Sequence, residues 1–500
     1  MPNQILIAIA LHVLVLLFGV SGCGSVVDRP LAPGRNLILV TIDTLRPDHL
    51  SFTGYARETS PFLDRFAANA VVFTQAIAQE TETGPSLGSM FTSLYPNELG
   101  LIDNGNVLTS EAETLAERLQ REGYHTISVT ASPNAGVRTG LDQGFDEMIE
   151  IWRELPDGVS DPRAEYVTAR TMRVLESVAG EDEKFFLYVH YIDPHTPYTP
   201  PEPFGSMFAV VPGKEKPYLL GDGQPFWGAA HYLTNHVGQI SPDVRLADRS
   251  DVSYYVSQYD GEIRYVDEYL GRFLAALDEG SLGDQAVIVV TSDHGESLGE
   301  HDTYFAHGTN VYDTEARIPL LIQVPSPDVQ PRRVDQQVSG VDLLPTILDL
   351  LGLQPQTSAR GRSLVPMILG RTLPEELSFT ETGPLDNHAY KHSIRFQGQK
   401  LILNEDGVDD YSLKPTGDRL QDEPWGVLNS QKRYELYDLL ADPEESRNLF
   451  RVGPNRHAAL LQTLLGLAEP GRIATGEKRT IEAPFDSKTE QLLRSLGYIR

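Results

Sequence analysis

The segment Ala286-Val287-Ile288-Val289-Val290-Thr291-Ser292-Asp293-His294 decides the fold. Its first six residues are apolar or β-branched, as expected of a strand buried on both faces of a parallel sheet. An acid and an imidazole follow at the carboxyl end of this strand, where open α/β sheets bind their ligands. Asn36–Ile42 is a second run of this kind, and Asp43 follows it. Two inner strands that end in metal-binding side chains predict one metal site assembled across the sheet.

The rest of the chain divides into an α/β part and a smaller C-terminal part. Strand and helix patterns alternate from Asn36 to about Gly352, whereas 393–403 has the pattern of a hairpin that turns at Gly398, and 434–439 that of a further strand. We therefore expect an α/β fold with a small antiparallel sheet at its C-terminal end. The predicted divisions are a leader over 1–23, a tether over 24–35 and a catalytic domain over 36–370. A C-terminal subdomain over 371–500 should hold the small sheet and terminal helices, one of them near 457–467.

Composition limits the possible partners. The 500 residues carry a net charge of −29, from 41 Lys and Arg against 70 Asp and Glu. No basic run is long enough to follow a phosphate backbone, so nucleic acid is excluded as a partner. An enzyme of this charge that acts on anionic substrates needs a metal or local cationic groups.

The single cysteine, Cys23, excludes an intramolecular disulfide and a cysteine-based zinc site. Residues 5–20 are almost wholly apolar, which is short for a membrane span and typical of a signal peptide. Val20-Ser21-Gly22-Cys23 resembles the lipobox of bacterial lipoproteins, in which the cysteine is lipidated. We expect an exported protein that is anchored to a bacterial membrane through lipid on Cys23. The alternative is an uncleaved apolar anchor.

A third segment lies between the two acids. In Glu82-Thr83-Gly84-Pro85-Ser86, Pro85 suits the first position of a helix, with Gly84 at its cap. Thr83 would then lie beside the free amide groups of a helix N-terminus, where an alkoxide and a tetrahedral anion are stabilised. The alternative is a threonine that only helps to begin the helix.

Several motifs together resemble the sulfatase family of the alkaline phosphatase superfamily. They occur in the family's order over residues 36 to about 450: 41–50, 83–86, 95–100, 193–198, 259–263, 292–297, 338–346 and 435–443. The resemblance implies a large mixed, mostly parallel sheet sandwiched by helices, plus the small C-terminal antiparallel sheet.

The chain departs from the family pattern at the positions of the nucleophile and of the metal ligands. Sulfatases carry Cys or Ser, matured to formylglycine, where this chain has Thr83, and Leu87 replaces the motif's Arg. The second acid of the first strand is Thr44. The resemblance places Asp43, Thr83, Asp293 and His294 around one divalent metal. An imidazole in place of an oxygen ligand favours Zn²⁺ or Mn²⁺ over Ca²⁺. With these changes the chain resembles the branch of the superfamily that uses a threonine nucleophile and has no formylglycine.

The resemblance also places His195 at the substrate, as leaving-group acid or oxyanion contact. His307 aligns with a Lys or His of the family that contacts the substrate. Asn104 is a candidate donor to the substrate anion, or simply part of an Asn-Gly turn. The predicted function is hydrolysis of a sulfate or phosphate ester through a covalent intermediate on Thr83. Two alternatives stay open within the enzymes: a phosphoethanolamine-type phosphotransferase, and a phosphodiesterase or phosphonate monoester hydrolase. Outside them, the chain could be an inactive binding protein on a sulfatase scaffold.

Overall fold

The computed structural model describes most of the chain. The described residues are 29–178, 183–210, 218–219, 239–240, 244, 246, 251–280, 282–383, 390–404, 433–451, 457–468 and 486–496. The predicted leader, with Cys23, lies outside them. Within these ranges no helix combines the length and the apolar character needed to cross a membrane.

A nine-stranded sheet forms the centre of the described structure, in the order β12-β2-β11-β8-β1-β5-β3-β4, with β13 paired to β2. Neighbouring strands are parallel except that β11 runs antiparallel to β2 and β8. The bounds of the strands are β1 Asn36–Ile42, β2 Val71–Ile77, β3 Tyr124–Thr130, β4 Glu147–Glu150, β5 Lys184–Tyr191, β8 Ala286–Thr291, β11 Arg317–Gln323, β12 Arg332–Val334 and β13 Val338–Ser339. The prediction of a mixed, mostly parallel sheet is confirmed.

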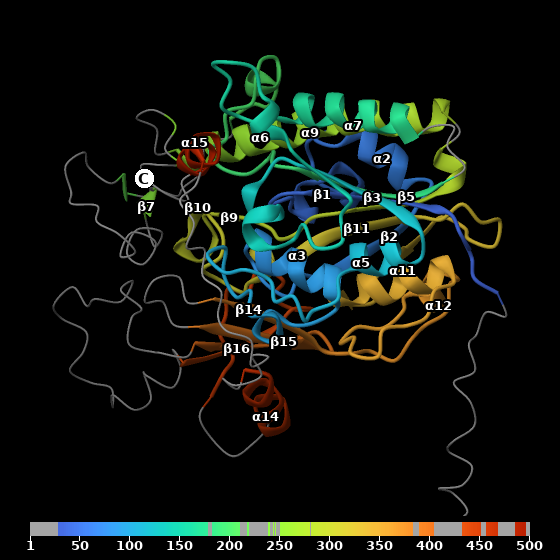
Figure 1. The fold of residues 1–500 in the computed structure, drawn as a ribbon. Helices are drawn as coiled ribbons and strands as arrows, with labels where there is room; N and C mark the ends of the chain where they lie inside the picture. Colours follow the sequence, from blue (N-terminus) through green and yellow to red (C-terminus); the bar gives the residue numbers. More distant parts are fainter. Residues whose placement is uncertain are drawn as a thin grey trace, which may run out of the picture.

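Helices cover both faces of this sheet (Figure 1). One face carries α2 Pro61–Ala67, α7 Ala164–Val178 and α9 Val252–Glu279, and the other carries α3 Thr83–Thr92, α5 Leu115–Arg121 and α11 Leu343–Leu351. The strands β1, β5 and β8 lie between the two apolar cores, and nearly all their side chains are buried. This burial on both faces explains the continuous apolar runs in the sequence.

A separate four-stranded antiparallel sheet lies below α3 in Figure 1. Its strands are β14 Ser378–Thr382, β15 Lys391–Phe396, β16 Gln399–Asn404 and β17 Tyr434–Asp438. The β15–β16 turn passes through Gly398, whose φ of 71° is the left-handed conformation that glycine adopts without strain. Helix α14, Ala458–Leu467, packs on this sheet through the fully buried Leu464.

Two chain segments extend the main body. Leu31 and Ala32 are buried, and the amide of Ala32 donates to the carbonyl of Leu350 at 2.8 Å, so this end of the predicted tether belongs to the folded body. Near the other end of the chain, α15, Ser487–Ser495, returns to the main body, where the indole of Trp152 donates to the Thr489 hydroxyl at 3.1 Å.

Candidate active site

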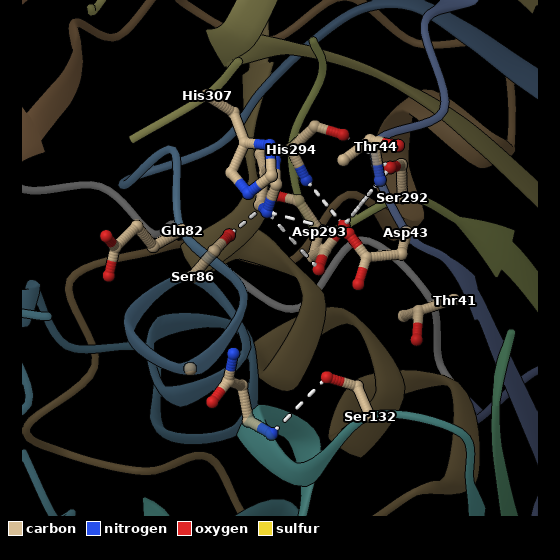
Figure 2. A network of polar contacts seen from close by, with 12 residues as sticks. Thr41, Asp43, Thr44, Glu82, Ser86, Ser132, Ser292, Asp293, His294 and His307 are labelled. Carbon is tan, nitrogen blue, oxygen red and sulfur yellow. Dashed lines mark hydrogen bonds and ion pairs between the residues drawn. The ribbon is translucent and has the colours of Figure 1, made fainter. Parts of the chain in front are cut away.

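Register brings the acids of two strands together. Thr41 of β1 lies beside Thr291 of β8 in a parallel pairing, so Asp43 and Asp293 leave the sheet side by side. Thr41 also lies beside His190 of β5. One ligand atom from each of Asp43, His190 and Asp293 lies within 4.8 Å of the other two. Figure 2 shows the carboxylates of Asp43 and Asp293 facing each other, with His294 beside them.

His294 presents a lone pair to these carboxylates. Its Nδ1 lies 2.9 Å from the carbonyl oxygen of Gly295, and a carbonyl can only accept, so Nδ1 carries the proton. The unprotonated Nε2 lies 3.7 Å from Asp43 Oδ1 and 3.6 Å from Asp293 Oδ2. A lone pair that faces two carboxylate oxygens in a buried site is repelled unless a cation lies between them.

The electrostatics of the cluster match a cation site. Asp43, His190, Asp293 and His294 are fully buried, and within the described part of the chain their converging side-chain atoms have no hydrogen-bond partner. Burial raises the pKa of Asp43 well above its usual value, and Asp293 and Glu296 raise it further. Burial also opposes ionisation of Asp293, but His294 and His190 outweigh it and hold the pKa of Asp293 below its usual value. Two carboxylates and two imidazoles are the donor set of Zn²⁺ or Mn²⁺.

Thr83 is the first residue of α3, with Glu82 at the cap. The helix therefore begins two residues before Pro85, the start expected from the sequence, because the chain already turns at Thr83. The Thr83 hydroxyl is buried and lies close enough to Asp43 to lower the pKa of that carboxyl. The nucleophile candidate, the helix N-terminus and the cation cluster therefore meet at one point.

The hydroxyl of Ser86 holds α3 against the cluster. It donates to the backbone carbonyl of Asp293 at 2.6 Å (Figure 2). This bond holds the first turn of α3 against the Asp293 loop.

Two further histidines lie beside His294. The ring centroid of His307 is 4.5 Å from that of His294 and 4.8 Å from that of His195. Nδ1 of His307 lies 3.0 Å from Glu296 Oε1, and Nδ1 of His195 lies 2.7 Å from the carbonyl of Thr196. Burial lowers the pKa of His307 to about 4 and, with help from His307, that of His195 to about 3.

Glu296 completes this group. Burial raises its pKa to about 7, against the influence of His195 and His294. A carboxylate behind an imidazole fixes the tautomer and stabilises the imidazolium form. His195, His307 and Glu296 can therefore hold and pass a proton at the edge of the cation cluster.

Asn104 lies at the beginning of α3. Its Oδ1 accepts the amide of Gly84 at 2.9 Å, while its own backbone amide donates to Glu82 Oε2 at 2.7 Å. The side chain therefore caps the helix beside Thr83, and its Nδ2 is buried with no hydrogen-bond partner.

Thr44 follows Asp43 in a strained conformation. Its φ of 55° is rare for a β-branched residue and costs of order 1–3 kcal/mol. The hydroxyl of Tyr259 holds this turn, because it donates to the carbonyl of Thr44 at 2.7 Å and accepts the amide of Arg46 at 3.0 Å. The turn directs the amide of Thr44 toward Asp293 Oδ1 at 3.3 Å.

Two members of the site, His190 and Glu296, were not predicted from the sequence. His190 is the seventh residue of β5, at the same end of the sheet as the two acids, and its signal was an imidazole at the end of an inner strand. Glu296 stands three residues after Asp293 in the motif 292–297, but nothing in the sequence shows that it turns back to His307.

Comparison with known proteins gives the class. Residues 35–353 match the family model described as Sulfatase. The chain therefore belongs to the sulfatase family, and the prediction of a hydrolase of that family is confirmed.

Particular relatives cover most of the chain. A multifunctional alkaline phosphatase superfamily protein, PehA, from Trinickia caryophylli is 26% identical over 89% of this chain and 96% of its own length. Mouse iduronate 2-sulfatase is 26% identical over 86% of this chain and 93% of its own. The crystal structure of a phosphonate monoester hydrolase from Agrobacterium radiobacter has the same fold, with a TM-score of 0.66 and 23% identity over 88% of this chain and 95% of that chain.

Proposed function

We propose that this chain is a metal-dependent hydrolase of sulfate or phosphate esters in which Thr83 is the nucleophile. The observation that carries the proposal is the position of the Thr83 hydroxyl, buried at the first residue of α3 and beside Asp43 of the cation cluster. Threonine cannot be oxidised to formylglycine, because its hydroxyl stands on a carbon that also bears a methyl group. The mechanism therefore uses the hydroxyl itself.

The residues that would hold the metal are Asp43, Asp293 and His294, with Thr83 at the reacting side. His190 joins this set, because its ring lies within the same cluster and its nitrogens have no hydrogen-bond partner among the described residues. A divalent cation bound there would supply positive charge that favours the ionised hydroxyl and the negative oxygens of the substrate.

The chain's own groups account for the transfer. The Thr83 oxygen forms a bond to sulfur or phosphorus, and the bond from that atom to the leaving oxygen breaks. The amide groups in the first turn of α3 stabilise the oxygens of the transferred group. The proton lost from Thr83 is accepted within the group of His195, His307 and Glu296, and the same group delivers one proton to the leaving alcohol.

The buried histidines serve this proton transfer. In His195 the contact to the Thr196 carbonyl places the proton on Nδ1, which leaves Nε2 as an acceptor. Nδ1 of His307 lies 3.0 Å from Glu296 Oε1, so a proton can pass between the imidazole and the carboxyl group. Water then hydrolyses the threonine ester, with the same imidazoles in the reverse role.

The proteins that are similar to this chain act on different ester classes, according to their names. They include an iduronate 2-sulfatase, a phosphonate monoester hydrolase and a multifunctional member of the alkaline phosphatase superfamily. We therefore propose a substrate that contains a sulfate, phosphate or phosphonate ester, and an assay should include all three.

Replacement of Thr83 tests the nucleophile. Purified protein loaded with Zn²⁺ or Mn²⁺ is assayed on an aryl sulfate, an aryl phosphodiester and an aryl phosphonate monoester. Thr83→Ala should lower kcat by at least about a thousandfold, the scale seen when a catalytic nucleophile is removed. Thr83→Ser should keep part of the activity, and peptide mapping after a slow substrate should locate the transferred group on Thr83.

Ser89→Ala is the matched control, because Ser89 is another buried hydroxyl of α3 with no hydrogen-bond partner. It should retain wild-type turnover. Full activity of Thr83→Ala would overturn the mechanism. No turnover of any ester by a folded, metal-loaded wild-type protein would favour a binding protein instead.

A further inference from the structure

A second buried amide lies against the beginning of α3. Asn134 belongs to the short helix η3, Pro133–Ala135, and is fully buried. Its backbone amide donates to the Ser132 hydroxyl at 3.3 Å, and Ser132 marks this turn beside α3 in Figure 2. A Cβ placed on Gly84 would lie 3.3 Å from the carbonyl oxygen of Asn134. Asn134 is therefore packed against the residue that follows Thr83.

The orientation of the Asn134 amide is fixed by Arg138. The guanidinium of Arg138 donates to Oδ1 of Asn134, and a guanidinium has no acceptor atom, so the atom that it contacts must be the oxygen. The other end of the amide is Nδ2. This nitrogen is buried and has no hydrogen-bond partner in the described part of the chain. A buried donor without a partner is uncommon in proteins and calls for an explanation.

The side chain of Asn104 is likewise an amide whose oxygen is occupied and whose nitrogen is unused. Its Oδ1 accepts the amide of Gly84, and a backbone amide can only donate, so the free atom is again Nδ2. The same hypothetical Cβ on Gly84 would lie 3.0 Å from Asn104 Oδ1. Asn104 therefore contacts Gly84 through its side chain, and Asn134 packs against Gly84 through its backbone carbonyl. Each residue has a buried amide nitrogen without a hydrogen-bond partner among the described residues, close to the residue that follows the proposed nucleophile.

We propose that Nδ2 of Asn134 binds an oxygen of the tetrahedral anion that reacts at Thr83, as a second donor beside Asn104, the donor already expected from the sequence. This inference rests on the proposed function and names the neutral donors of its substrate site. Both amides are held before the anion arrives, because Arg138 and Gly84 occupy their oxygens. The positive charge of Arg138 also polarises the Asn134 amide, which makes its N–H groups stronger donors. Arg138 is thus a positioning residue.

Equilibrium binding of inorganic sulfate and inorganic phosphate tests the inference. Calorimetric titration is carried out on the metal-loaded full chain, with metal content and melting temperature checked for every variant. Asn134→Ala should weaken binding of the preferred anion by about ten- to a hundredfold, the range expected for one hydrogen bond to a charged group. Asn104→Ala should have an effect of the same size.

Asn134→Asp separates a binding role from a structural one. Aspartate has the same shape and can keep the contact with Arg138, so a merely structural role predicts unchanged anion affinity. A donor role predicts affinity at least as low as that of Asn134→Ala, because a carboxylate oxygen replaces the donor and repels the anion. Asn106→Ala is the control, since Asn106 lies in the same loop as Asn104 and its Oδ1 serves only the amide of Ile102, at 3.4 Å.

The outcomes distinguish this inference from the assignment of Thr83. If folded Asn134→Ala and Asn134→Asp proteins bind both anions within twofold of wild type, the proposal is overturned. If they lose affinity while Thr83→Ala retains full turnover, the anion site stands and the nucleophile assignment fails.

Discussion

His190 adds a second imidazole to a cluster whose other donors lie just beyond the ends of strands. Its side chain projects from β5 itself, and both ring nitrogens are buried without a hydrogen-bond partner. Nε2 lies 3.7 Å from Asp43 Oδ2 and 3.8 Å from Asp293 Oδ2. Those separations leave room for a cation between the ring and the two carboxylates.

His190→Ala should therefore lower the affinity for Zn²⁺ or Mn²⁺ by at least about tenfold, even if activity cannot be measured. Metal content after dialysis against a metal buffer, determined by mass spectrometry, is the measurement. His125→Ala is the control, because His125 lies on the neighbouring strand β3 and pairs only with Glu147, at 3.1 Å. Equal metal content in wild type and His190→Ala would remove His190 from the site.

At the scale of residues, the sequence predicts side chains just beyond the end of a strand better than side chains within it. Asp43 and Asp293 could be placed together because parallel register carries both to one edge of the sheet. His190 could not, since a histidine inside an apolar run is equally compatible with a core position. Asn134 could not either, because its role depends on a contact with Arg138 that only the folded loop creates.

Among the elements, the short helix α10, Asp313–Ala316, joins the main body to the small sheet. The carboxylate of Asp313 accepts Arg395 Nη1 of β15 at 2.6 Å and Lys400 Nζ of β16 at 3.0 Å. These three side chains are 13%, 10% and 2% exposed. Loss of the carboxylate would leave the largely buried Arg395 without the acid it pairs with, whereas Lys400 would keep Glu445 at 2.9 Å. A buried charge that loses its partner is more costly than loss of a surface ion pair.

Asp313→Asn should therefore destabilise the protein by about 3–5 kcal/mol. Chemical denaturation is the measurement. Asp328→Asn, which removes the exposed pair with Arg29, should cost less than about 1 kcal/mol. Equal stability of the two variants would show that α10 does not hold the small sheet through this carboxylate.

The pH dependence provides a second measure of the same contact. Burial opposes ionisation of Asp313, but Arg395 and Lys400 outweigh it and lower its pKa to about 2. A carboxyl whose pKa falls on folding stabilises the protein above its unfolded pKa of about 4, and this stability is lost as the pH falls through the folded pKa. The difference in stability between wild type and Asp313→Asn should therefore shrink between about pH 4 and pH 2. A constant difference across that window would contradict the ion-pair account.

Over the whole molecule, buried strand runs and their polar ends were sufficient to predict the architecture. Asn36–Ile42 and Ala286–Thr291 became the adjacent strands β1 and β8, and the C-terminal hairpin turned at Gly398 as expected. The antiparallel strand β11 could not be predicted from pattern, because a buried strand has the same apolar run in either direction. Terminal helices were expected after residue 371, but the attachment of α15 at Trp152 was beyond prediction from sequence, since it joins residues 337 positions apart.

The whole chain needs an anchor other than its charge to be held at a membrane. With a net charge of −29, the protein is repelled by anionic lipid surfaces, so electrostatic adsorption cannot hold it there. We propose that lipid on Cys23 anchors it. Cys23→Ala should then move the protein from the membrane fraction to the soluble fraction or leave it unprocessed. Ser21→Ala, a change in the same segment, should keep the membrane location and the lipid mass on Cys23. If Cys23→Ala is processed normally and remains in the membrane fraction, an apolar anchor over residues 5–20 holds the protein in place of the lipid.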